Sequence, residues 1–389
     1  MLIDHVVPSY FFTLYTEYEP MHLLDITVAN YNNYDTVAIK VHSKMNALTG
    51  LNGMGKTNLL DAIYYLCLGK SYFNSSDRHV VRHGEEFFRV QGAFETKTGK
   101  ETVEIKVSPG RKKEIVFSGK KRDRLSDHIG TLPCVIIAPD DIQLMLEGSE
   151  ERRKFLDNTL MQYDPVYVAD IIAYNRLLKQ RNALLKTFAE KHYYDQSLVD
   201  SISNGMYEPA ARIFAARKKL VEGLSPLFEK YYGLISDERE HCAITYKSSL
   251  EGHTLQELFA QNMEKDKILT RTTTGIHKDD ILFKMNDIQL KNFASQGQLK
   301  SFVLSLKLAQ YEVVSSSGGT LPILILDDIF DKLDRDRVGR LLQLLSEDNF
   351  GQIFISDTNE DRVPGILAQM NLEHQSYVVH GGTVKYRTQ

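Results

Sequence analysis

Residues 50–57 read Gly50-Leu51-Asn52-Gly53-Met54-Gly55-Lys56-Thr57, which matches the pattern GxxxxGK[ST] at every fixed position. Strand-like residues run from Asp35 into this loop. After it, apolar side chains recur at helical spacing until Gly69, which is suited to end a helix. A strand, a glycine-rich loop and a helix in this order are the context in which the pattern forms a phosphate-binding loop. An accidental match in a turn is the alternative, and this context argues against it.

Such a loop holds the phosphates of a nucleotide. Its glycines let backbone N–H groups converge on phosphate oxygens without clashes from Cβ atoms, and the following helix directs its positive N-terminal end at the same place. We expect Lys56 to neutralise the β- and γ-phosphate oxygens and Thr57 to place its hydroxyl on Mg²⁺. ATP and Mg²⁺ are therefore the expected cofactors.

A second motif is the apolar run from Leu321 to Leu326, which ends in Asp327 and Asp328. A strand buried on both faces has this appearance when its C-terminal end meets a ligand. We expect Asp327 to hold Mg²⁺, directly or through water, and Asp328 to act as the catalytic residue that orients or deprotonates the attacking water. Alone, such a strand is more often plain structure, but a P-loop in the same chain favours the functional interpretation.

A third motif is the tetrapeptide Ser295-Gln296-Gly297-Gln298, which precedes a helix with an apolar stripe. Taken by itself it is equally a helix cap. The order of P-loop, Ser-x-Gly-Gln helix and acidic strand, however, is the arrangement of ATP-binding cassettes. In that class the signature helix of one subunit closes over the nucleotide of the other, so an ATP-dependent homodimer is expected.

The sequence between Lys56 and Ser295 is much longer than a transporter ATPase subunit requires. The excess coincides with a helical region that contains two heptad stripes, which suit an antiparallel helix pair. Pro226 is expected to break or kink the second helix. The fold class is therefore α/β, an ABC-type (Rad50-like) P-loop ATPase head with an inserted, mainly helical arm domain. The expected parts are an N-terminal extension or mis-assigned start (1–20), the N-terminal head lobe (21–138), the arm (139–270) and the C-terminal head lobe (271–389).

Six segments, in order along the chain, resemble the RecF family of bacterial DNA replication and repair proteins. They are GLNGMGKTNLLDAIYYL (50–66), PDDIQLMLEGSEERRKFLD (139–157), YNRLLKQRNALLK (174–186), GIHKDD (275–280), ASQGQLKSFVLSLKLA (294–309) and ILDDIFDKLD (325–334). The resemblance implies ATP-dependent dimerisation on double-stranded DNA and a weak, DNA-stimulated ATPase. It also implies a D-loop at Asp334, and loading at gaps and single/double-strand junctions with the mediator proteins RecO and RecR.

The chain departs from the pattern of cassette ATPases in three places. No glutamine aligns with the glutamine loop, where this chain reads Ala138-Pro139-Asp140-Asp141. The switch strand offers Ser356 and Asp357 in place of a histidine. Asp328 stands where fast hydrolases have glutamate, which shortens its reach to the water, so we expect slow hydrolysis that times a binding cycle.

Basic side chains are the candidate DNA contacts. Residues 111–124 contain seven basic and two acidic residues around a short apolar run, which predicts a hairpin with cationic arms. The candidates are Lys112, Lys113, Lys120, Lys121 and Arg122 here, and Arg176, Lys179 and Lys186 on one face of the 174–186 helix. A solvated loop and an ordinary amphipathic helix are the alternatives. The segment His277, Asp279 and Asp280 is interpreted as a hydrogen-bonded turn and not as a metal site.

Composition sets the limits. The formal net charge is −4, so DNA binding must come from local basic patches. Three widely spaced cysteines without a CxxC pair fit a reducing cytoplasm. No apolar stretch is long enough to cross a bilayer, so no membrane is expected. A transporter ATPase remains the alternative function. A P-loop kinase would need no signature helix, and a nuclease would need a further cluster of acids.

Overall fold

The computed structural model describes residues 18–19, 21–236, 241–286, 288–290, 294–330, 335–347 and 349–387. Most of the segment expected to be an extension, residues 1–17 and 20, lies outside this range, as does Asp334. The chain divides into two compact units. The arm unit contains residues 143–295, and the head unit contains the described residues up to 142 and from 296 onward.

The head unit contains an antiparallel sheet in the order β2-β1-β4-β5-β6-β7. Its strands are β1 (Met21–Tyr31), β2 (Tyr34–Lys40), β4 (Phe88–Thr96), β5 (Gly99–Val107), β6 (Glu114–Phe117) and β7 (Lys120–Arg122). Alternate residues of β1 are buried, as expected for a strand with one face on the core. The predicted hairpin is present, because β6 and β7 pair antiparallel around a turn in which Ser118 and Gly119 both have positive φ.

A second sheet of the head unit has the order β15-β14-β3-β13-β12-β8. Its strands are β3 (Met45–Thr49), β8 (Cys134–Ile137), β12 (Ile323–Leu326), β13 (Ile353–Asp357), β14 (His374–His380) and β15 (Thr383–Tyr386). All neighbours are parallel except the β14–β15 hairpin. Every residue of β3, β8, β12 and β13 is buried, which explains the continuous apolar sequences of β8 and β12.

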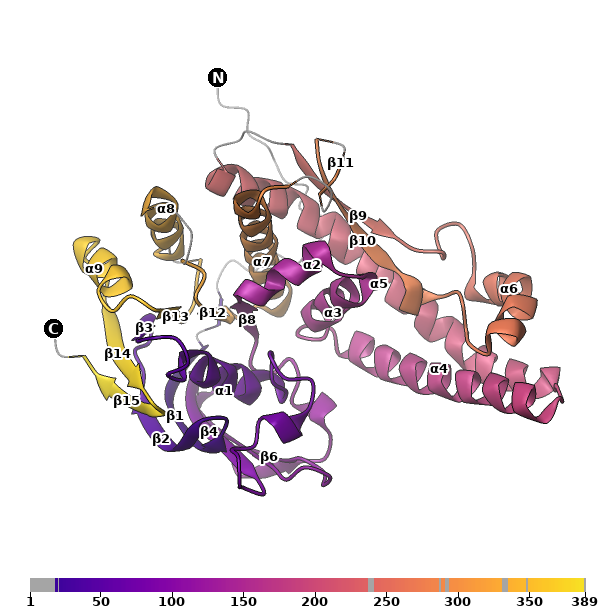
Figure 1. The fold of residues 1–389 in the computed structure, drawn as a ribbon, viewed down its shortest axis with the longest axis horizontal. Helices are drawn as coiled ribbons and strands as arrows, with labels where there is room; N and C mark the ends of the chain where they lie inside the picture. The colour runs from indigo at the N-terminus through magenta and orange to yellow at the C-terminus, as the bar shows by residue number, and fades with distance from the viewer. Residues whose placement is uncertain are drawn as a thin grey trace. The chain divides into compact units, whose positions relative to one another are not determined.

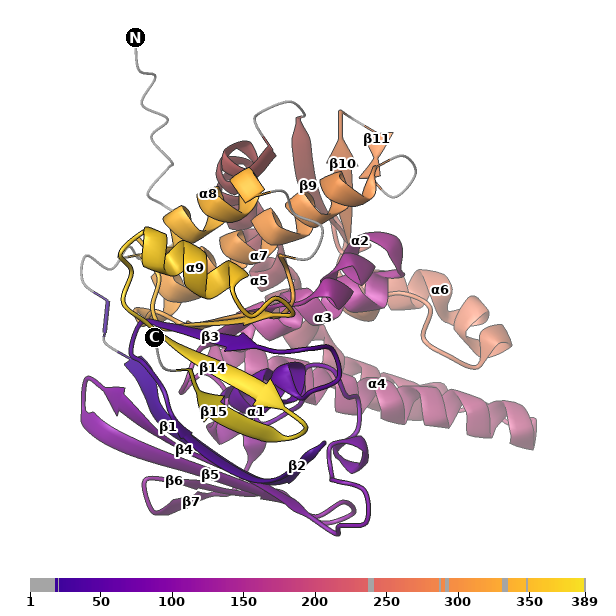
Figure 2. The same ribbon diagram turned by 60° about the vertical axis from the view of Figure 1, so that its left-hand side comes forward.

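Helices cover both faces of the parallel sheet (Figure 2). Helix α1 (Lys56–Leu68) lies between the two sheets, and its apolar residues join side chains of both in one core. It ends at Gly69, as the sequence predicts. Helices α7 (Gln296–Gly318), α8 (Arg335–Leu345) and α9 (Arg362–Gln369) lie on the opposite face. Consecutive parallel strands therefore end at one edge, where their following loops meet.

The arm unit is built on two long helices that pack side by side, α4 (Pro165–Lys191) and α5 (Gln196–Ser236) (Figure 1). Shorter elements complete it: α2 (Gln143–Leu146), α3 (Ser149–Leu160), α6 (Leu255–Leu269) and the strands β9 (Cys242–Lys247), β10 (Asp280–Met285) and β11 (Ile288–Gln289). The expected break at Pro226 is wrong, because α5 continues through both Pro209 and Pro226. Among the described residues, no helix is both long enough and apolar enough to cross a membrane.

The unit boundaries differ from those expected at residues 139 and 270. Strand β10 falls within the range expected for the C-terminal head lobe, but among the described strands it pairs with β9 and β11. That small sheet packs on α5 and α3, so it is part of the arm unit and the boundary falls at Ser295. Periodicity identifies a strand, whereas the partner of that strand is set by contacts far apart in the sequence.

Candidate nucleotide site

The P-loop connects β3 to α1, and its glycines are required by the backbone. Gly50, Gly53 and Gly55 have φ values of 142°, 78° and 116°, a region that side chains with Cβ rarely enter. A Cβ on Gly50 would lie 2.4 Å from the carbonyl oxygen of Val379, so only glycine fits against β14. The exposed Leu51 side chain stands on the outside of the loop.

Lys56 and Thr57 begin α1 and turn toward the inside of the loop. The Lys56 Nζ donates to the carbonyl oxygens of Gly50 and Leu51 at 2.8 and 3.2 Å, and the side chain is buried. The Thr57 hydroxyl lies 2.9 and 3.1 Å from the two carboxylate oxygens of Asp327 at the end of β12. The structure therefore brings together two motifs that the sequence separates by 270 residues.

Asp327 has the environment of a cation ligand. Burial raises the pKa of its carboxyl group, and hydrogen bonds from Ser356 and Thr57 oppose that increase. A carboxylate and a threonine hydroxyl are hard oxygen ligands of the kind that Mg²⁺ takes beside nucleotide phosphates. The residues therefore fit a magnesium ion, which would also offset the cost of the buried charge.

Ser356, at the end of β13, joins the two acidic residues. Its hydroxyl donates to Asp327 Oδ1 at 2.7 Å and accepts from the backbone N–H of Asp328 at 2.8 Å. Asp328 has φ 45°, a left-handed conformation that non-glycine residues rarely adopt, so this hydrogen bond supports a strained backbone. Asp357 forms a two-pronged ion pair with Arg362, at 2.6 and 2.7 Å. Of the two predicted switch residues, only Ser356 contacts the acids.

The stretch that replaces the glutamine loop contributes a buried ion pair. The Asp141 carboxylate lies 3.2 Å from Lys307 Nζ on α7, accepts from the Tyr72 hydroxyl, and accepts from the backbone N–H of Ala138 at 2.8 Å. Its neighbour Asp140 is exposed. Sequence reasoning missed Lys307 and Tyr72, because nothing in their local sequence marks a partner so distant along the chain.

The signature tetrapeptide stands at the start of α7. Ser295 and Gln296 are exposed, and Gly297 and Gln298 are half-buried. The predicted apolar stripe of the helix, Phe302, Leu306, Ala309 and Val313, is fully buried. The tetrapeptide therefore presents its first two residues to solvent while the rest of the helix anchors in the core of the head unit.

The predicted DNA contacts separate into two groups. Most are exposed: Lys112, Lys120 and Lys121 around the β6–β7 hairpin, and Arg176, Lys179 and Lys186 on α4. Arg122 is half-buried, with its guanidinium 5.0 Å from the centre of the Phe117 ring. Lys113 differs from the expectation. Its Nζ bonds to Gly69 O at 2.8 Å and to Asp77 at 3.0 Å, so its charge serves the structure of the head.

The His277 segment is a hydrogen-bonded turn of the arm unit, as predicted. The two ring nitrogens of His277 lie 2.9 Å from the Tyr174 hydroxyl and 3.1 Å from the Thr272 carbonyl oxygen. Burial lowers the pKa of His277 to about 4. The acids that follow pair with Arg217 and Arg152. Within the described part of the chain, no group of three or more His, Cys, Asp or Glu side chains could hold a metal ion.

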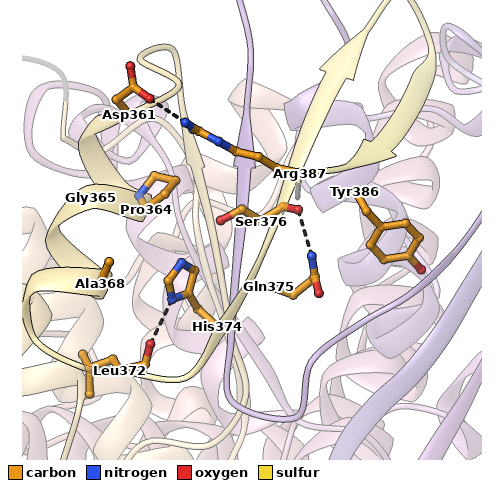
Figure 3. A pocket seen from close by; sticks show the side chains of 10 residues that line it. All are labelled: Asp361, Pro364, Gly365, Ala368, Leu372, His374, Gln375, Ser376, Tyr386 and Arg387. Atoms are coloured by element: carbon orange, nitrogen blue, oxygen red, sulfur yellow. Dashed lines mark hydrogen bonds and ion pairs between the residues drawn. The ribbon is translucent and has the colours of Figure 1, made fainter. Parts of the chain in front are cut away.

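A separate concavity of about 800 Å³ opens between α9, the start of β14 and the end of β15 (Figure 3). Figure 3 shows its lining side chains, with an ion pair between Arg387 and Asp361 of 2.6 Å at one end. No glycine of the P-loop and neither acid of β12 lines it, so it is distinct from the nucleotide site.

Together, the P-loop after β3, the acids that follow β12 in the same parallel sheet and the inserted arm define a P-loop ATPase head of the SMC type. The family model for the RecF/RecN/SMC N terminal domain matches residues 22–377. The Smc head domain from Pyrococcus furiosus has a TM-score of 0.55 at 15% identity over 95% of this chain and 96% of that chain, which shows the fold alone.

Proteins with higher sequence identity to this chain show which family within the class it belongs to. The chain is 41% identical to the DNA replication and repair protein RecF of Flavobacterium johnsoniae, over 92% of this chain and 99% of that protein. It is 39% identical to RecF of Bacteroides thetaiotaomicron over 94% and 98%. The structure of the recombination mediator protein RecF with ATP in the RecFOR pathway has a TM-score of 0.87 at 28% identity, over 96% of this chain and 100% of that chain. The chain belongs to the RecF family.

Proposed function

We propose that this protein is an ATP-dependent DNA-binding protein of recombinational repair and replication restart, acting in the cytoplasm. The observation that carries the proposal is the contact between the Thr57 hydroxyl and the Asp327 carboxylate beside the P-loop. That geometry suits ATP. The RecF structure with a TM-score of 0.87 is described as RecF with ATP. The full-length similarity to RecF proteins leaves a transporter ATPase without support.

Different residues of the head unit bind the phosphates, the metal ion and the attacking water. Backbone N–H groups of the P-loop and the N-terminus of α1 face the phosphates, and Lys56 exchanges its loop carbonyl partners for phosphate oxygens. Thr57 and Asp327 hold Mg²⁺, which supplies neutralisation of phosphate charge when bound. Asp328 orients the attacking water. Its side chain is shorter than glutamate and its backbone is strained, which supports slow hydrolysis that times release.

A second copy of the chain completes the site. The exposed residues Ser295 and Gln296 of one copy cover the nucleotide held by the P-loop of the other, together with Gly297, Gln298 and the D-loop residue Asp334. ATP therefore drives formation of a homodimer. The dimer binds double-stranded DNA and single/double-strand junctions, and it works with RecO and RecR to load recombinase at gaps. The pathway named for the similar RecF structure supports these partners.

The exposed lysines of the β6–β7 hairpin contact phosphates, so binding is indifferent to sequence and sensitive to salt. The test is fluorescence anisotropy of a labelled duplex between 50 and 200 mM salt, with ATP and Mg²⁺. Replacing Lys120 and Lys121 together by alanine should make the log–log salt dependence shallower by about 2, at about 0.9 per lost phosphate contact. The control replaces two exposed lysines elsewhere, Lys265 and Lys385. An affinity that stays flat with salt in the unmodified protein would refute phosphate binding.

A further inference from the structure

The outer face of the P-loop is held by two turns that sequence patterns did not single out. The carbonyl oxygen of Met54 accepts from the Asn33 side-chain amide and from the backbone N–H of Gly382, both at 3.2 Å. The carbonyl oxygen of the next residue, Gly55, accepts from the Tyr34 hydroxyl at 3.0 Å. Asn33 belongs to the β1–β2 turn, Tyr34 begins β2, and Gly382 belongs to the β14–β15 turn.

These contacts fix peptide planes, not only atoms. In a trans peptide the C=O of one residue and the N–H of the next point in opposite directions, and no cis peptide occurs among the described residues. A hydrogen bond that holds the Met54 carbonyl outward therefore turns the Gly55 N–H inward. The Gly55 carbonyl is held by the Tyr34 hydroxyl and by the Leu59 N–H of α1, both at 3.0 Å, and these bonds turn the Lys56 N–H inward in the same way. Both N–H groups line the loop that takes the phosphates.

The loop needs such restraints because its glycines restrict the backbone conformation very little. Glycine populates a wide range of φ and ψ, so a glycine-rich loop without fixed peptide planes would spend much of its time in conformations unsuited to phosphate. The packing around it is close. A Cβ on Gly55 would lie 2.7 Å from the Asn33 amide nitrogen and 3.0 Å from the Tyr34 hydroxyl, and one on Gly382 would lie 2.7 Å from Asn33 O.

We propose that Tyr34 and Asn33 are positioning residues for the nucleotide phosphates, acting through the Met54 and Gly55 carbonyls. The proposal rests on the proposed ATP binding of the head. Tyr34 is fully buried and its burial raises the pKa of the phenol, so the hydroxyl remains a donor at physiological pH. The Asn33 amide is oriented by a second bond, because its oxygen accepts from the Asn58 side chain on α1 at 2.7 Å.

The test compares Tyr34→Phe and Asn33→Ala with a matched control, Tyr377→Phe. Tyr377 is equally buried in the head unit, and its hydroxyl donates to the Lys40 carbonyl oxygen at 2.9 Å, away from the P-loop. Affinities for ATP and ADP are measured by calorimetry, in Mg²⁺ and in EDTA. Thermal unfolding without nucleotide is measured alongside. Because Asn33 is exposed, its replacement leaves the core intact.

Tyr34→Phe should bind both nucleotides about five- to tenfold more weakly, as expected for one lost hydrogen bond, with the same loss in EDTA. Asn33→Ala should also bind both nucleotides more weakly, although Gly382 still holds the Met54 carbonyl. Tyr377→Phe should lower thermal stability to a similar extent but bind ATP within about twofold of the unmodified protein. Equal ATP affinities for Tyr34→Phe and Tyr377→Phe would overturn the positioning role alone. Failure of the unmodified protein to bind ATP would instead overturn the proposed function.

Discussion

Ser356→Ala is the most informative single change in the nucleotide site. The serine hydroxyl is buried and holds both acids of β12, through Asp327 Oδ1 at 2.7 Å and the Asp328 N–H at 2.8 Å. Alanine keeps the backbone of β13 and removes only the oxygen. The Asp328 N–H then loses this acceptor at a residue with φ 45°, and Asp327 keeps the hydrogen bond from Thr57.

The magnitude follows from those two bonds. A hydrogen bond to a charged group contributes about 1.5–3 kcal/mol, and a buried N–H left without a partner costs about 1–3 kcal/mol. The two effects share one atom, so we expect the free energy of unfolding to fall by about 2–4 kcal/mol in total. Loss of a group that orients a metal ligand typically weakens metal binding by about 10- to 100-fold, and we expect the Mg²⁺ affinity of the ATP complex to fall within that range.

The pH dependence has a defined sign. Burial raises the pKa of Asp327 above its usual 3.8, and the Ser356 hydrogen bond lowers it. Ionised Asp327 is the form that binds Mg²⁺, so Mg²⁺ binding is lost as the pH falls through the raised pKa. Without Ser356 the pKa rises further, and the loss should begin at a higher pH. The contribution of Asp327 to folding stability runs the other way: it is fully present below pH 3.8 and is lost as the pH rises through the raised pKa, where the buried carboxyl group ionises.

The assay is a Mg²⁺ titration of ATP binding at several pH values, with urea unfolding of the same variants. Ser305→Ala is the control, because Ser305 is also buried in the head unit and donates only to the Ser301 carbonyl, at 2.7 Å. Both variants should lose stability. Only Ser356→Ala should weaken the binding of Mg²⁺ to the ATP complex, and its affinity for ATP in EDTA should be unchanged. The same Mg²⁺ dependence in both variants would refute the assigned role of Ser356.

Two further predictions concern the arm unit. Arg217→Met should lower the free energy of unfolding by about 3–5 kcal/mol, because it strands the carboxylates of Asp157 and Asp279 that Arg217 pairs with at 2.8 and 3.1 Å. Arg212→Ala, whose side chain is 50% exposed, should lower the urea midpoint less than Arg217→Met does, and equal losses would contradict the reasoning. His277 has its pKa lowered from 6.5 to about 4, so its neutral form contributes stability above pH 6.5 that is lost as the pH falls to 4. The loss should reach about 3 kcal/mol, and His277→Phe should have a smaller drop in urea midpoint between pH 7 and 4; an equal drop would exclude His277 as a cause.

Most of the nucleotide site could be predicted from local sequence patterns. The P-loop is a contiguous motif whose glycines meet a backbone requirement, and the strand before Asp327 is apolar because β12 is buried on both faces. The β6–β7 hairpin was predicted from the short apolar run between two clusters of basic residues. These features depend on neighbours in the sequence, so sequence alone could predict them.

Contacts between distant residues could not be predicted in this way. Lys307 lies in the mainly apolar helix α7, and its local sequence gives no sign that it pairs with Asp141. Lys113 belongs to a run of basic residues, and only the fold shows that Asp77 and the end of α1 bind its charge. Pro226 follows the local rule for a helix breaker, yet packing against α4 and the small sheet keeps α5 continuous.

The ATP-dependent dimer on DNA is tested most directly by sedimentation of the unmodified protein and Lys56→Ala. Each is run with ATP and Mg²⁺, with and without a short duplex. We expect ATP to convert the unmodified protein to a dimer on DNA, while the Lys56 variant stays monomeric because it lacks the charge that holds the β- and γ-phosphates. An unmodified protein that remains monomeric under every condition would contradict the dimer, and Ser295 would then stand before an ordinary helix.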